Sequence, residues 1–478
     1  MKSRRLTSFI IIAFITLSTI AVSVNLSTGA PTWSSNVRLT NHLGPDYINI
    51  LGGALALDSE GHIHVVSYYA GQIYHIYDNN SYINETVIAQ AQSAGQGYDA
   101  APTIFIDEND TIHVAYYSSD GNDYEIYYTH STPTGGFITP VKVTDNTAAD
   151  GFPKIVVDSE GVVHISYQLS EYVDIGGKDK PIRIVLRYVH SETGGGFTSP
   201  INITYPLLPD MSVGHDMVVD KNDNVHIAFM AFNGYNPLYN ASDIVYTNES
   251  SSFSSFQIID KTYQDFNPSI AVDDNLTVHL VFKGNGSIYD GNIHYQYLYY
   301  GNNSGGSFNA STISKITDIS FSHSPRIAVS PNGTLNIAFY GWDKTWPQNY
   351  SRVMYMSGLN GSFSQKTFIP PQDQDQYLPS LAIGADNQVH IVYMNGDSSP
   401  GATSNIDLYY VTTSEYYPVG VPEPESQEML FLVIGVAAAV NGVAVFAALF
   451  FKFRRLEKEV WKPKFGEDED REPYETDT

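Results

Sequence analysis

The chain has 478 residues, of which 42% are hydrophobic and 13% aromatic, so it can bury a large core and is not a disordered chain. It contains no cysteine, which excludes disulfides, zinc–thiolate sites and thiol catalysis. The formal net charge of −26 is carried almost entirely by residues 27–451, and a domain this acidic repels phosphate backbones, which argues against a nucleic-acid partner.

The first 26 residues have the pattern of a targeting segment. Lys2, Arg4 and Arg5 precede an apolar run from Leu6 to Val24. This pattern predicts a secretory signal peptide or an uncleaved signal anchor, and cleavage is the favoured interpretation.

Residues 27–417 are built from a repeat. One copy is ALDSEGHIHVVSYY, which begins at Ala56, and six further copies follow at intervals of roughly fifty to sixty residues. Each copy predicts a β-hairpin, because alternating apolar residues lead into a polar turn and then into a β-branched and aromatic strand. The other copies begin at Phe105, Val156, Val218, Ala271, Ala328 and Ala382.

The turn of most hairpins is opened by an Asp. Its side chain can bond backbone groups two residues on, while Gly61, Gly161 or a nearby Asn or Asp supplies a positive φ. These turn acids are Asp58, Asp107, Asp158, Asp220 and Asp273.

Two further strands complete each unit, as in YEIYYTH from Tyr124 followed by TPVKVTD. Four strands are the size of a propeller blade. The N-terminal segment resembles a fourth strand without the other three, and the last repeat lacks a fourth. The sequence therefore predicts an all-β, seven-bladed β-propeller of four-stranded blades, in which the strand around Val37 to Thr40 completes the blade begun near Pro379.

The C-terminal part has the pattern of a membrane anchor. A polar linker at residues 418–428 leads into 23 apolar residues at 429–451, interrupted only by Asn441, and this segment is long enough to span a bilayer as one helix. Lys452, Arg454 and Arg455 follow and predict that the tail at 452–478 is cytoplasmic. We expect a single-pass cell-membrane protein with an extracellular propeller.

Glycosylation sequons agree with this topology, because they all lie in the proposed outer domain. The Asn residues that open an N-x-S/T are Asn79, Asn84, Asn109, Asn202, Asn240, Asn248, Asn275, Asn285, Asn302, Asn309, Asn332, Asn349 and Asn360.

The repeats resemble those of the sialidase-like, BNR-type β-propellers, whose Asp-box reads S-x-D-x-G-x-T-W between the third and fourth strands. The segment STGAPTW, Ser27 to Trp33, keeps the Ser, Thr and Trp of that box. The box Asp is replaced near Gly29, Pro133 and Gly194, and the Trp by Phe137 and Phe197 in two copies. The resemblance implies the fold.

A sialidase would also have three arginines that converge on a carboxylate, a Tyr–Glu nucleophile pair and an acidic proton donor. The outer domain has five arginines, of which only one is expected on an innermost strand, so we expect no sialidase site. They are Arg38, Arg183, Arg187, Arg326 and Arg352.

A His recurs in six hairpins and invites a metal hypothesis. Equivalent residues of different blades are spread around a ring and cannot converge on one ion, so we expect these side chains to pack between blades. Each precedes a small or β-branched residue by two positions, such as Val66 or Ala115. The six are His64, His113, His164, His226, His279 and His390.

Acids and aromatics recur in the loops that lead into the innermost strands, and these loops are expected to meet at one mouth of the central channel. Such a set suits sugar rings, sugar hydroxyls or a cation. The candidate ligand-binding residues are Asp46, Tyr47, Tyr98, Asp99, Asp150, Phe152, Asp265, Phe266, Asp375 and Tyr377, with Trp342 and Trp346 from a neighbouring loop.

These observations favour a membrane-anchored binding or adhesion module for glycans or a surface protein, without a catalytic site. One alternative is a carbohydrate-active enzyme, a glycoside hydrolase or lyase that uses acids at the mouth. Another is a structural cell-envelope protein whose mouth is plugged by its own loops. No metal site or cofactor is expected, although the acidic turns can attract calcium.

Overall fold

The computed structural model describes most of the propeller and none of the terminal segments. All described residues belong to the first of two compact units, Met1–Tyr416 and Tyr417–Thr478. The described residues are 31–42, 44–79, 82–92, 100–174, 179–203, 212–232, 242–259, 264–289, 292–309, 311–319, 321–342, 351–359, 361–370, 375–396 and 406–413.

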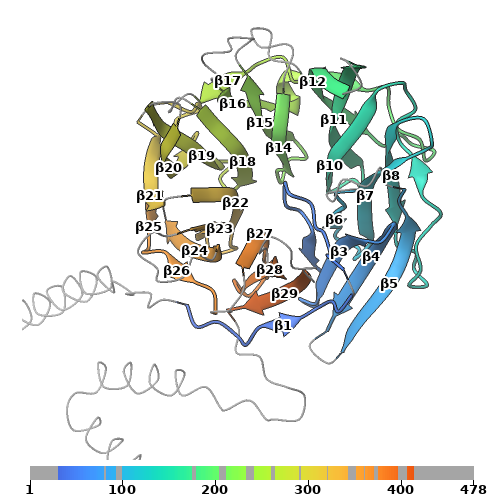
Figure 1. Ribbon diagram of the computed structural model, residues 1–478, viewed down its shortest axis with the longest axis horizontal. Coiled ribbons are helices and arrows are strands. Elements are labelled where there is room, and N and C mark those ends of the chain that lie inside the picture. Colours follow the sequence, from blue (N-terminus) through green and yellow to red (C-terminus); the bar gives the residue numbers. More distant parts are fainter. Residues whose placement is uncertain are drawn as a thin grey trace, which may run out of the picture. The chain divides into compact units, whose positions relative to one another are not determined.

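The strands form a closed ring of seven antiparallel blades, as predicted (Figure 1). Within each blade the strands follow one another as a meander, from the centre of the ring outward. Blades 4 and 5 count as one sheet only because Ser242 and Gln264 form a single parallel bridge between them.

Blades 1 to 3 have four strands each. Blade 1 comprises β2 (Leu55–Leu57), β3 (Ile63–Tyr69), β4 (Gln72–Asp78) and β5 (Ile83–Gln90). Blade 2 comprises β6 (Thr103–Ile106), β7 (Ile112–Ser119), β8 (Tyr124–His130) and β9 (Val141–Lys142). Blade 3 comprises β10 (Ala149–Val157), β11 (Val163–Asp174), β12 (Asp179–His190) and β13 (Ile201–Ile203).

Blades 4 and 5 follow the same plan. Blade 4 comprises β14 (Ser212–Val219), β15 (Val225–Phe232), β16 (Ser242–Asn248), the 3₁₀ turn η1 (Glu249–Ser251) and β17 (Gln257–Ile259). Blade 5 comprises β18 (Gln264–Val272), β19 (Val278–Tyr289), β20 (Asn292–Asn302) and β21 (Ile313–Ile319).

Blade 6 has a divided outer strand, and blade 7 takes its outer strand from the start of the chain. Blade 6 comprises β22 (Phe321–Val329), β23 (Leu335–Trp342), β24 (Arg352–Leu359), β25 (Ser362–Phe363) and β26 (Thr367–Phe368). Blade 7 comprises β27 (Asp375–Ile383), β28 (Val389–Gly396), β29 (Asp407–Thr412) and β1 (Val37–Arg38).

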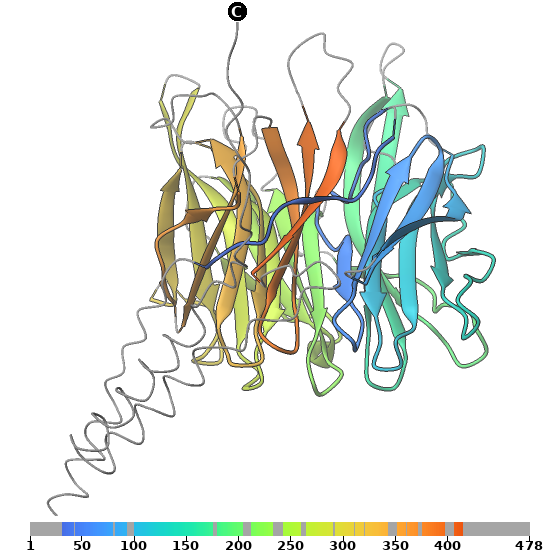
Figure 2. The ribbon, with the colours of Figure 1, turned by 90° about the horizontal axis from the view of Figure 1, so that it is seen from below.

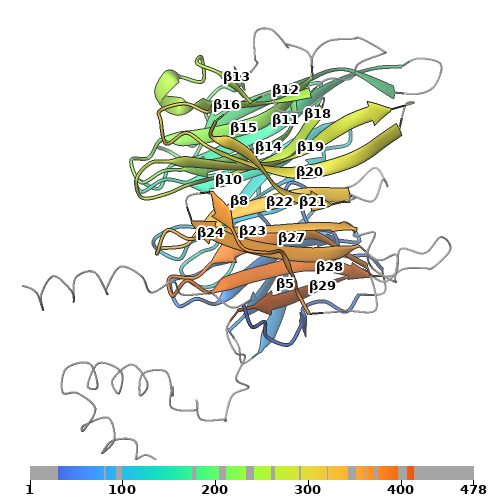
Figure 3. The ribbon, with the colours of Figure 1, turned by 90° about the vertical axis from the view of Figure 1, so that its left-hand side faces the viewer.

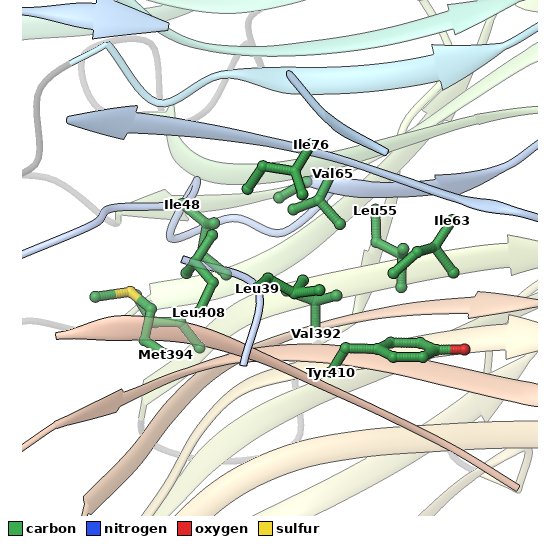
Figure 4. Packing of buried hydrophobic residues seen from close by; sticks show 12 residues of the cluster. Leu39, Ile48, Leu55, Ile63, Val65, Ile76, Val392, Met394, Leu408 and Tyr410 are labelled. Atoms are coloured by element: carbon green, nitrogen blue, oxygen red, sulfur yellow. The ribbon is translucent and has the colours of Figure 1, made fainter. Parts of the chain in front are cut away.

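Ring closure by the N-terminal strand is confirmed. Val37 pairs with Tyr410, and Arg38 forms an ion pair with Asp407 at 2.7 Å. Leu39 and Ile48 then enter a buried cluster with Leu55 of blade 1 and Leu408 of blade 7 (Figure 4). The first and last blades therefore share one core.

The turns between first and second strands all lie on one face of the ring, the lower edge in Figure 2, which we call the Asp-turn face. Successive turns bond across the blades: Ser59 donates from N and Oγ to Asp110, and Ser159 does the same to Asp223. The opposite face, where the second strands end, is the mouth face. Figure 3 shows the blades from the side.

Each turn Asp holds its turn through the backbone. In blade 5, Oδ1 of Asp273 accepts hydrogen bonds from the N–H groups of Asn275 (2.9 Å) and Thr277 (2.7 Å). The positive φ falls on Gly61 and Gly161, as expected, but blade 5 places Leu276 there, at φ 63°. A leucine in this conformation is strained, because its Cβ crowds the following carbonyl.

The blades join through a recurring aromatic contact. The aromatic residue of the degenerate Asp-box packs on an aromatic or imidazole ring of the third strand of the preceding blade. Ring centroids lie 5.6 Å apart for Phe197 and Tyr128, 5.0 Å for Phe363 and Tyr300, and 5.2 Å for Trp33 and Tyr355. The same contact joins Phe137 to His75, Phe253 to Tyr188 and Phe308 to Tyr246.

The residues described contain no helix that is long and apolar enough to cross a membrane. The apolar segments at residues 1–26 and 429–451, the linker and the tail lie outside the described residues.

Replacing Trp33 by Ala is expected to destabilise the propeller by about 2–4 kcal/mol, because it removes the aromatic contact by which the N-terminal segment holds blade 6. Denaturant unfolding of the soluble fragment 27–417 measures this change. Tyr82, which is 57% exposed after the third strand of blade 1, is the matched control. Tyr82→Ala is expected to change stability by no more than about 0.5 kcal/mol. Equal effects of the two substitutions would contradict closure by this segment.

Replacing Leu276 by Gly is expected to stabilise the domain by about 0.5–1 kcal/mol, since glycine adopts a positive φ without strain. Leu276 is 37% exposed, so little packing is lost. Leu276→Ala keeps the strain and is expected to leave the free energy of unfolding unchanged or lower. A glycine variant no more stable than the alanine variant would contradict the strain.

Candidate functional site

A segment of the chain is held between the inner strands of blades 3 and 6. A segment at residues 48–53, which we call the plug, precedes β2 and is held by cations from blades on opposite sides. Lys154 donates to the carbonyls of Leu51 (2.5 Å) and Gly52 (3.2 Å). Arg326 donates from Nη2 to the carbonyl of Ile50 (2.8 Å).

An acid between these two cations balances their charge. Asp216 of β14 lies 2.9 Å from Lys154 Nζ and accepts from the hydroxyl of Ser269 at 2.8 Å. Burial would raise the pKa of Asp216, but Lys154 and Arg326 outweigh burial and lower it. Burial lowers the pKa of Lys154 to about 8 and that of Arg326 to about 10, although Asp216 partly offsets both. The plug therefore rests on a buried ionic cluster.

A β-bulge recurs where the innermost strands reach the mouth. The register of β10 shifts between Gly151 and Lys154, and that of β18 between Phe266 and Ser269. Phe152 and Leu378 lie inside such bulges at φ 52° and 48°. Bulges re-aim side chains and concentrate near functional sites, so a functional site is expected at the mouth ends of the inner strands.

Beside each bulge the inner strand pairs with the sixth residue of the second strand. In blades 5, 6 and 7 these pairs are Phe266 with Lys283, His323 with Tyr340, and Tyr377 with Met394. The rings of Tyr340 and Tyr377 meet edge to face, 5.9 Å apart. We call Phe266, Lys283, Tyr340 and Tyr377 the mouth arc.

Lys283 has the chemistry of a general base within the mouth arc. Its ammonium lies 5.4 Å from the centre of the Phe266 ring, and its side chain is only 7% exposed. Burial lowers the pKa of Lys283 to about 8, so a large fraction of its amine groups is neutral just above physiological pH. Tyr340 interacts electrostatically with Arg326 beneath it, which links the arc to the cations of the plug.

The acids predicted at the mouth lie at the mouth ends of the inner strands but are buried in blade joints. Asp46 and Asp265 are 0% exposed and Asp150 is 1% exposed. Two of these carboxylates form hydrogen bonds with residues four positions away in the sequence. Asp46 bonds with His42 (2.7 Å), and Asp150 accepts from Asn146 (2.6 Å). Burial raises the pKa of Asp150 to about 7 and also raises that of Asp46. Binding of a ligand by these acids stays a prediction.

The remaining predicted residues are dispersed. Asp375 accepts from the N–H of Ser351 at 2.6 Å, Phe152 packs on Tyr117, and Tyr47 bridges to Tyr68. Phe266 and Tyr377 belong to the mouth arc. Tyr98, Asp99, Trp346 and the side chain of Trp342 lie outside the described residues.

The recurring His residues form relays between turn and strand. In blade 5, His279 Nε2 lies 3.3 Å from Asp273 Oδ2, and His279 Nδ1 lies 2.8 Å from the hydroxyl of Tyr300. Blades 2, 3 and 4 repeat this geometry. The residues two positions on, such as Val66 and Ala115, are fully buried, which confirms packing between blades.

Blade 6 shows that the relay is structural. Asn336 replaces the His, donates to Ser330 Oγ at 2.7 Å and accepts from the hydroxyl of Tyr355 at 2.6 Å. The same bonds persist there without any group that titrates near neutral pH, so neither proton transfer nor metal binding explains the pattern.

One group of described carboxylates is close enough to surround a cation. Atoms of Asp120, Glu125 and Asp145 lie within 4.8 Å of one another. Lys142 already neutralises this group, at 2.8 Å from Asp120 and 2.5 Å from Asp145. Lys142 lowers the pKa of Asp120 to about 2. Because Lys142 occupies this group, it does not support a specific metal site. Attraction of calcium by the acidic loops stays a prediction.

The five arginines do not form a sialidase triad. Arg326 lies on the innermost strand β22, as expected, but it holds the plug. Arg38 pairs with Asp407, Arg183 with Glu171, and Arg187 donates to Asn202. Arg352 lies on the third strand of blade 6.

The described sequons differ in access. Asn84, Asn109, Asn202, Asn275, Asn309 and Asn332 are exposed, whereas Asn79, Asn248 and Asn302 are half-buried. Asn240, Asn349, Asn360 and the side chain of Asn285 lie outside the described residues. Modification of any of them stays a prediction.

Sequence reasoning missed Lys283 and Tyr340. Both occupy the sixth position of the second strand, where the seven hairpins carry Tyr68, Tyr117, Gln168, Met230, Lys283, Tyr340 and Met394. The residue type at this position therefore differs between repeats that are otherwise regular. An alignment of the seven repeats could have identified this position as a candidate site.

No protein-family model and no curated protein matches the sequence. The fold is similar to that of a polysaccharide lyase of family PL25, an ulvan lyase, with a TM-score of 0.56 and 10% identity over 78% of this chain and 95% of the other. A structure titled as this lyase bound to -[GlcA(1-4)Rha3S]- matches equally. The polysaccharide lyase Uly1 matches with a TM-score of 0.51 and 11% identity over 82% of this chain and 94% of the other.

The NanB sialidase from Streptococcus pneumoniae matches at a TM-score of 0.42 with 8% identity over 80% of this chain and 93% of the other. Identities this low show the fold alone. The chain is a seven-bladed β-propeller, a fold that it shares with these polysaccharide lyases.

The buried histidines predict that the folded domain loses stability in mild acid. Burial lowers the pKa of His390 to about 4, from 6.5 in the unfolded chain. Between those values the unfolded chain binds more protons, so stability falls as the pH drops below 6.5, by about 2 kcal/mol from this group at pH 5. Asp150, whose pKa is raised, acts in the opposite sense. His390→Asn, which copies Asn336, is therefore expected to lose about 2 kcal/mol less than the unmodified domain between pH 7 and pH 5.

The measurement is denaturant unfolding of both proteins at the two pH values. The contribution of Asp150 is common to both and cancels in the comparison. Equal losses for the two proteins would contradict the burial of a neutral His390.

Proposed function

We propose that this chain is a membrane-anchored, carbohydrate-active enzyme that cleaves an acidic polysaccharide at the mouth arc by β-elimination. The observation that carries the proposal is the placement of Lys283, with its pKa lowered to about 8, over the ring of Phe266, in the blade that precedes the one with Tyr340. The mouth arc lies directly above the cations of the plug.

The charge distribution supports an anionic substrate. The domain is strongly acidic, yet Lys154 and Arg326 bring cations to two inner strands and Lys283 brings one to the second strand of blade 5. Local positive groups within an otherwise repulsive surface would favour a ligand that presents its carboxylate to the centre of the ring. The lyase structure with a glucuronic-acid-containing sugar concerns a substrate of this class.

Buried carboxylates weigh against hydrolysis. A glycoside hydrolase needs two carboxyl groups beside the scissile bond. Asp46, Asp150 and Asp265 are less exposed, at 0–1%, than Lys283 at 7%, which weighs against such a pair among them. An elimination needs a base and an acid, and the mouth arc offers a lysine and tyrosines.

In the proposed reaction, the neutral amine of Lys283 removes the proton from the sugar carbon next to the carboxylate. The electron pair forms a carbon–carbon double bond, and the bond from the adjacent carbon to the glycosidic oxygen breaks. Tyr340 gives a proton to the departing oxygen. Phe266 and Tyr377 offer apolar faces on which sugar rings can stack.

Replacing Lys283 by Met is expected to lower cleavage at least about 100-fold, because a general base commonly contributes a factor of this size or more. The assay follows the ultraviolet absorbance of unsaturated uronic-acid ends in a panel of uronic-acid polysaccharides. Activity is expected to rise with pH up to about 8, as Lys283 loses its proton. The matched control is Lys315→Met, which removes an exposed lysine that covers Tyr297 at 4.5 Å on the same blade.

Binding without cleavage is the competing function, and the same panel tests it. If the soluble domain binds a polysaccharide, loses it on Lys283→Met and yields no unsaturated product, the domain is a binding module. Equal effects of Lys283→Met and Lys315→Met would overturn the mouth arc as the site.

A further inference from the structure

Blades 3 to 7 share one kind of β-bulge near the mouth ends of their inner strands. In each of them the inner strand has one residue more than the second strand over the same stretch. One residue within each bulge has a left-handed backbone, with φ between 45° and 56°. These residues are Phe152, Gly214, Asn267, Ser324 and Leu378.

In blade 5 this bulge decides which way Phe266 points. Phe266 pairs with Lys283 and Ser269 pairs with Val281, so three steps along β18, the innermost strand, match two steps along β19 (Figure 1). Side chains alternate between the two faces of a strand, so the bulge brings Phe266 to the face on which Lys283 lies. In a regular register continued from Ser269, Asn267 would be opposite Lys283, and the Phe266 ring would be on the other face.

The sequence of blade 5 favours this bulge. Asn267 has φ 49°, and asparagine adopts the left-handed conformation more readily than most residues that have a Cβ. Pro268 follows it and has no N–H to donate to a regular ladder. Blades 3, 6 and 7 also have a proline here, but they place Phe, Ser or Leu in the left-handed position. Among these four blades, blade 5 therefore forms the bulge with the least strain.

The amide of Asn267 is directed toward the neighbouring blade. A Cβ built on Gly214 of blade 4 would lie 3.5 Å from Asn267 Oδ1. Asn267 therefore affects the mouth arc through the backbone that carries Phe266.

We propose that Asn267 is a positioning residue of the mouth arc, whose left-handed backbone holds the Phe266 ring against the Lys283 ammonium, 5.4 Å from the ring centre. The inference rests on the proposed role of Lys283 as the base. The ring keeps water from the ammonium, and burial is the cause that lowers the pKa of Lys283. The attraction of a ring face for an ammonium acts in the opposite direction, so the exclusion of water is the larger effect.

The test follows the protonation of Lys283 in the full chain. Acetic anhydride reacts with a neutral amine and not with an ammonium, so the rate at which Lys283 is acetylated at each pH, measured by mass spectrometry, gives its titration midpoint. The unmodified chain is expected to have a midpoint of about 8. A midpoint near that of an exposed lysine, about 10.4, would overturn both the positioning and the role of Lys283 as the base.

Substitutions at position 267 then separate the backbone from the side chain. Asn267→Gly keeps the left-handed backbone and is expected to leave the midpoint unchanged. Asn267→Val is expected to raise it by about one pH unit or more, because a β-branched residue resists a positive φ and the displaced ring exposes the ammonium to water. Asn267→Ala is a milder variant with a smaller shift in the same direction, and it replaces valine if valine prevents folding. Equal midpoints in the folded glycine and alanine variants would contradict the proposal.

Leu276→Val is the matched control. Leu276 also has a positive φ, 63°, and belongs to the same blade, but it lies in the turn at the Asp-turn face. Valine there is expected to strain blade 5 without moving the Lys283 midpoint. A shift as large as that of Asn267→Val would mean that general loosening of the blade changes Lys283, and the positioning role would be wrong.

Cleavage assays distinguish this inference from the proposed function. A midpoint raised from about 8 to about 9 lowers the neutral fraction of Lys283 at pH 8 about five-fold, so Asn267→Val is expected to lower cleavage by that factor at pH 8 and to recover at higher pH. A loss of the same size at every pH would contradict an effect through Lys283. If the midpoints shift as expected but the unmodified chain cleaves no polysaccharide, the proposed elimination is wrong and the positioning of Phe266 by Asn267 stands.

Discussion

Blades 1 to 6 of this propeller are each stabilised by an aromatic side chain that the next blade supplies. The third-strand tyrosine is fixed from one side by the recurring imidazole and covered from the other by the Asp-box aromatic, as Tyr300 is by His279 and Phe363. The imidazole is in turn fixed by the turn acid. A blade without a following neighbour would therefore expose the tyrosine and the hydrophobic surface around it.

Because each of these blades needs a following neighbour, closure of the ring depends on the two ends of the propeller segment. The last aromatic in the series is Trp33, which comes from the start of the sequence and packs on Tyr355 of blade 6. The buried cluster around Leu39 and Leu408 then joins blade 7 to blade 1. Such contacts close a loop that spans most of the propeller, so their entropic cost is large unless the intervening blades are already formed.

Comparison of the repeats separates residues with a structural role, which recur between blades, from residues that differ between blades. Residues that recur in most blades, such as Asp273 and His279, are occupied by turn and packing bonds, and Asn336 shows that the chemistry of the imidazole is dispensable there. Residues that differ between blades are free to specialise. Lys283 and Tyr340 are such residues, and they lie at bulges above a buried Lys154–Asp216–Arg326 cluster.

By itself the sequence determined the fold class, the number of blades and the strand that closes the ring, because hydrophobic alternation and turn chemistry act between near neighbours and repeat seven times. It also placed Phe266 and Tyr377 at the mouth. Only the tertiary structure decided that Asp46, Asp150 and Asp265 are buried, that Lys154 and Arg326 hold residues 48–53, and that Lys283 lies beside Phe266. Exposure and the proximity of charges depend on which blades meet across the ring, and no local pattern in the sequence carries that information.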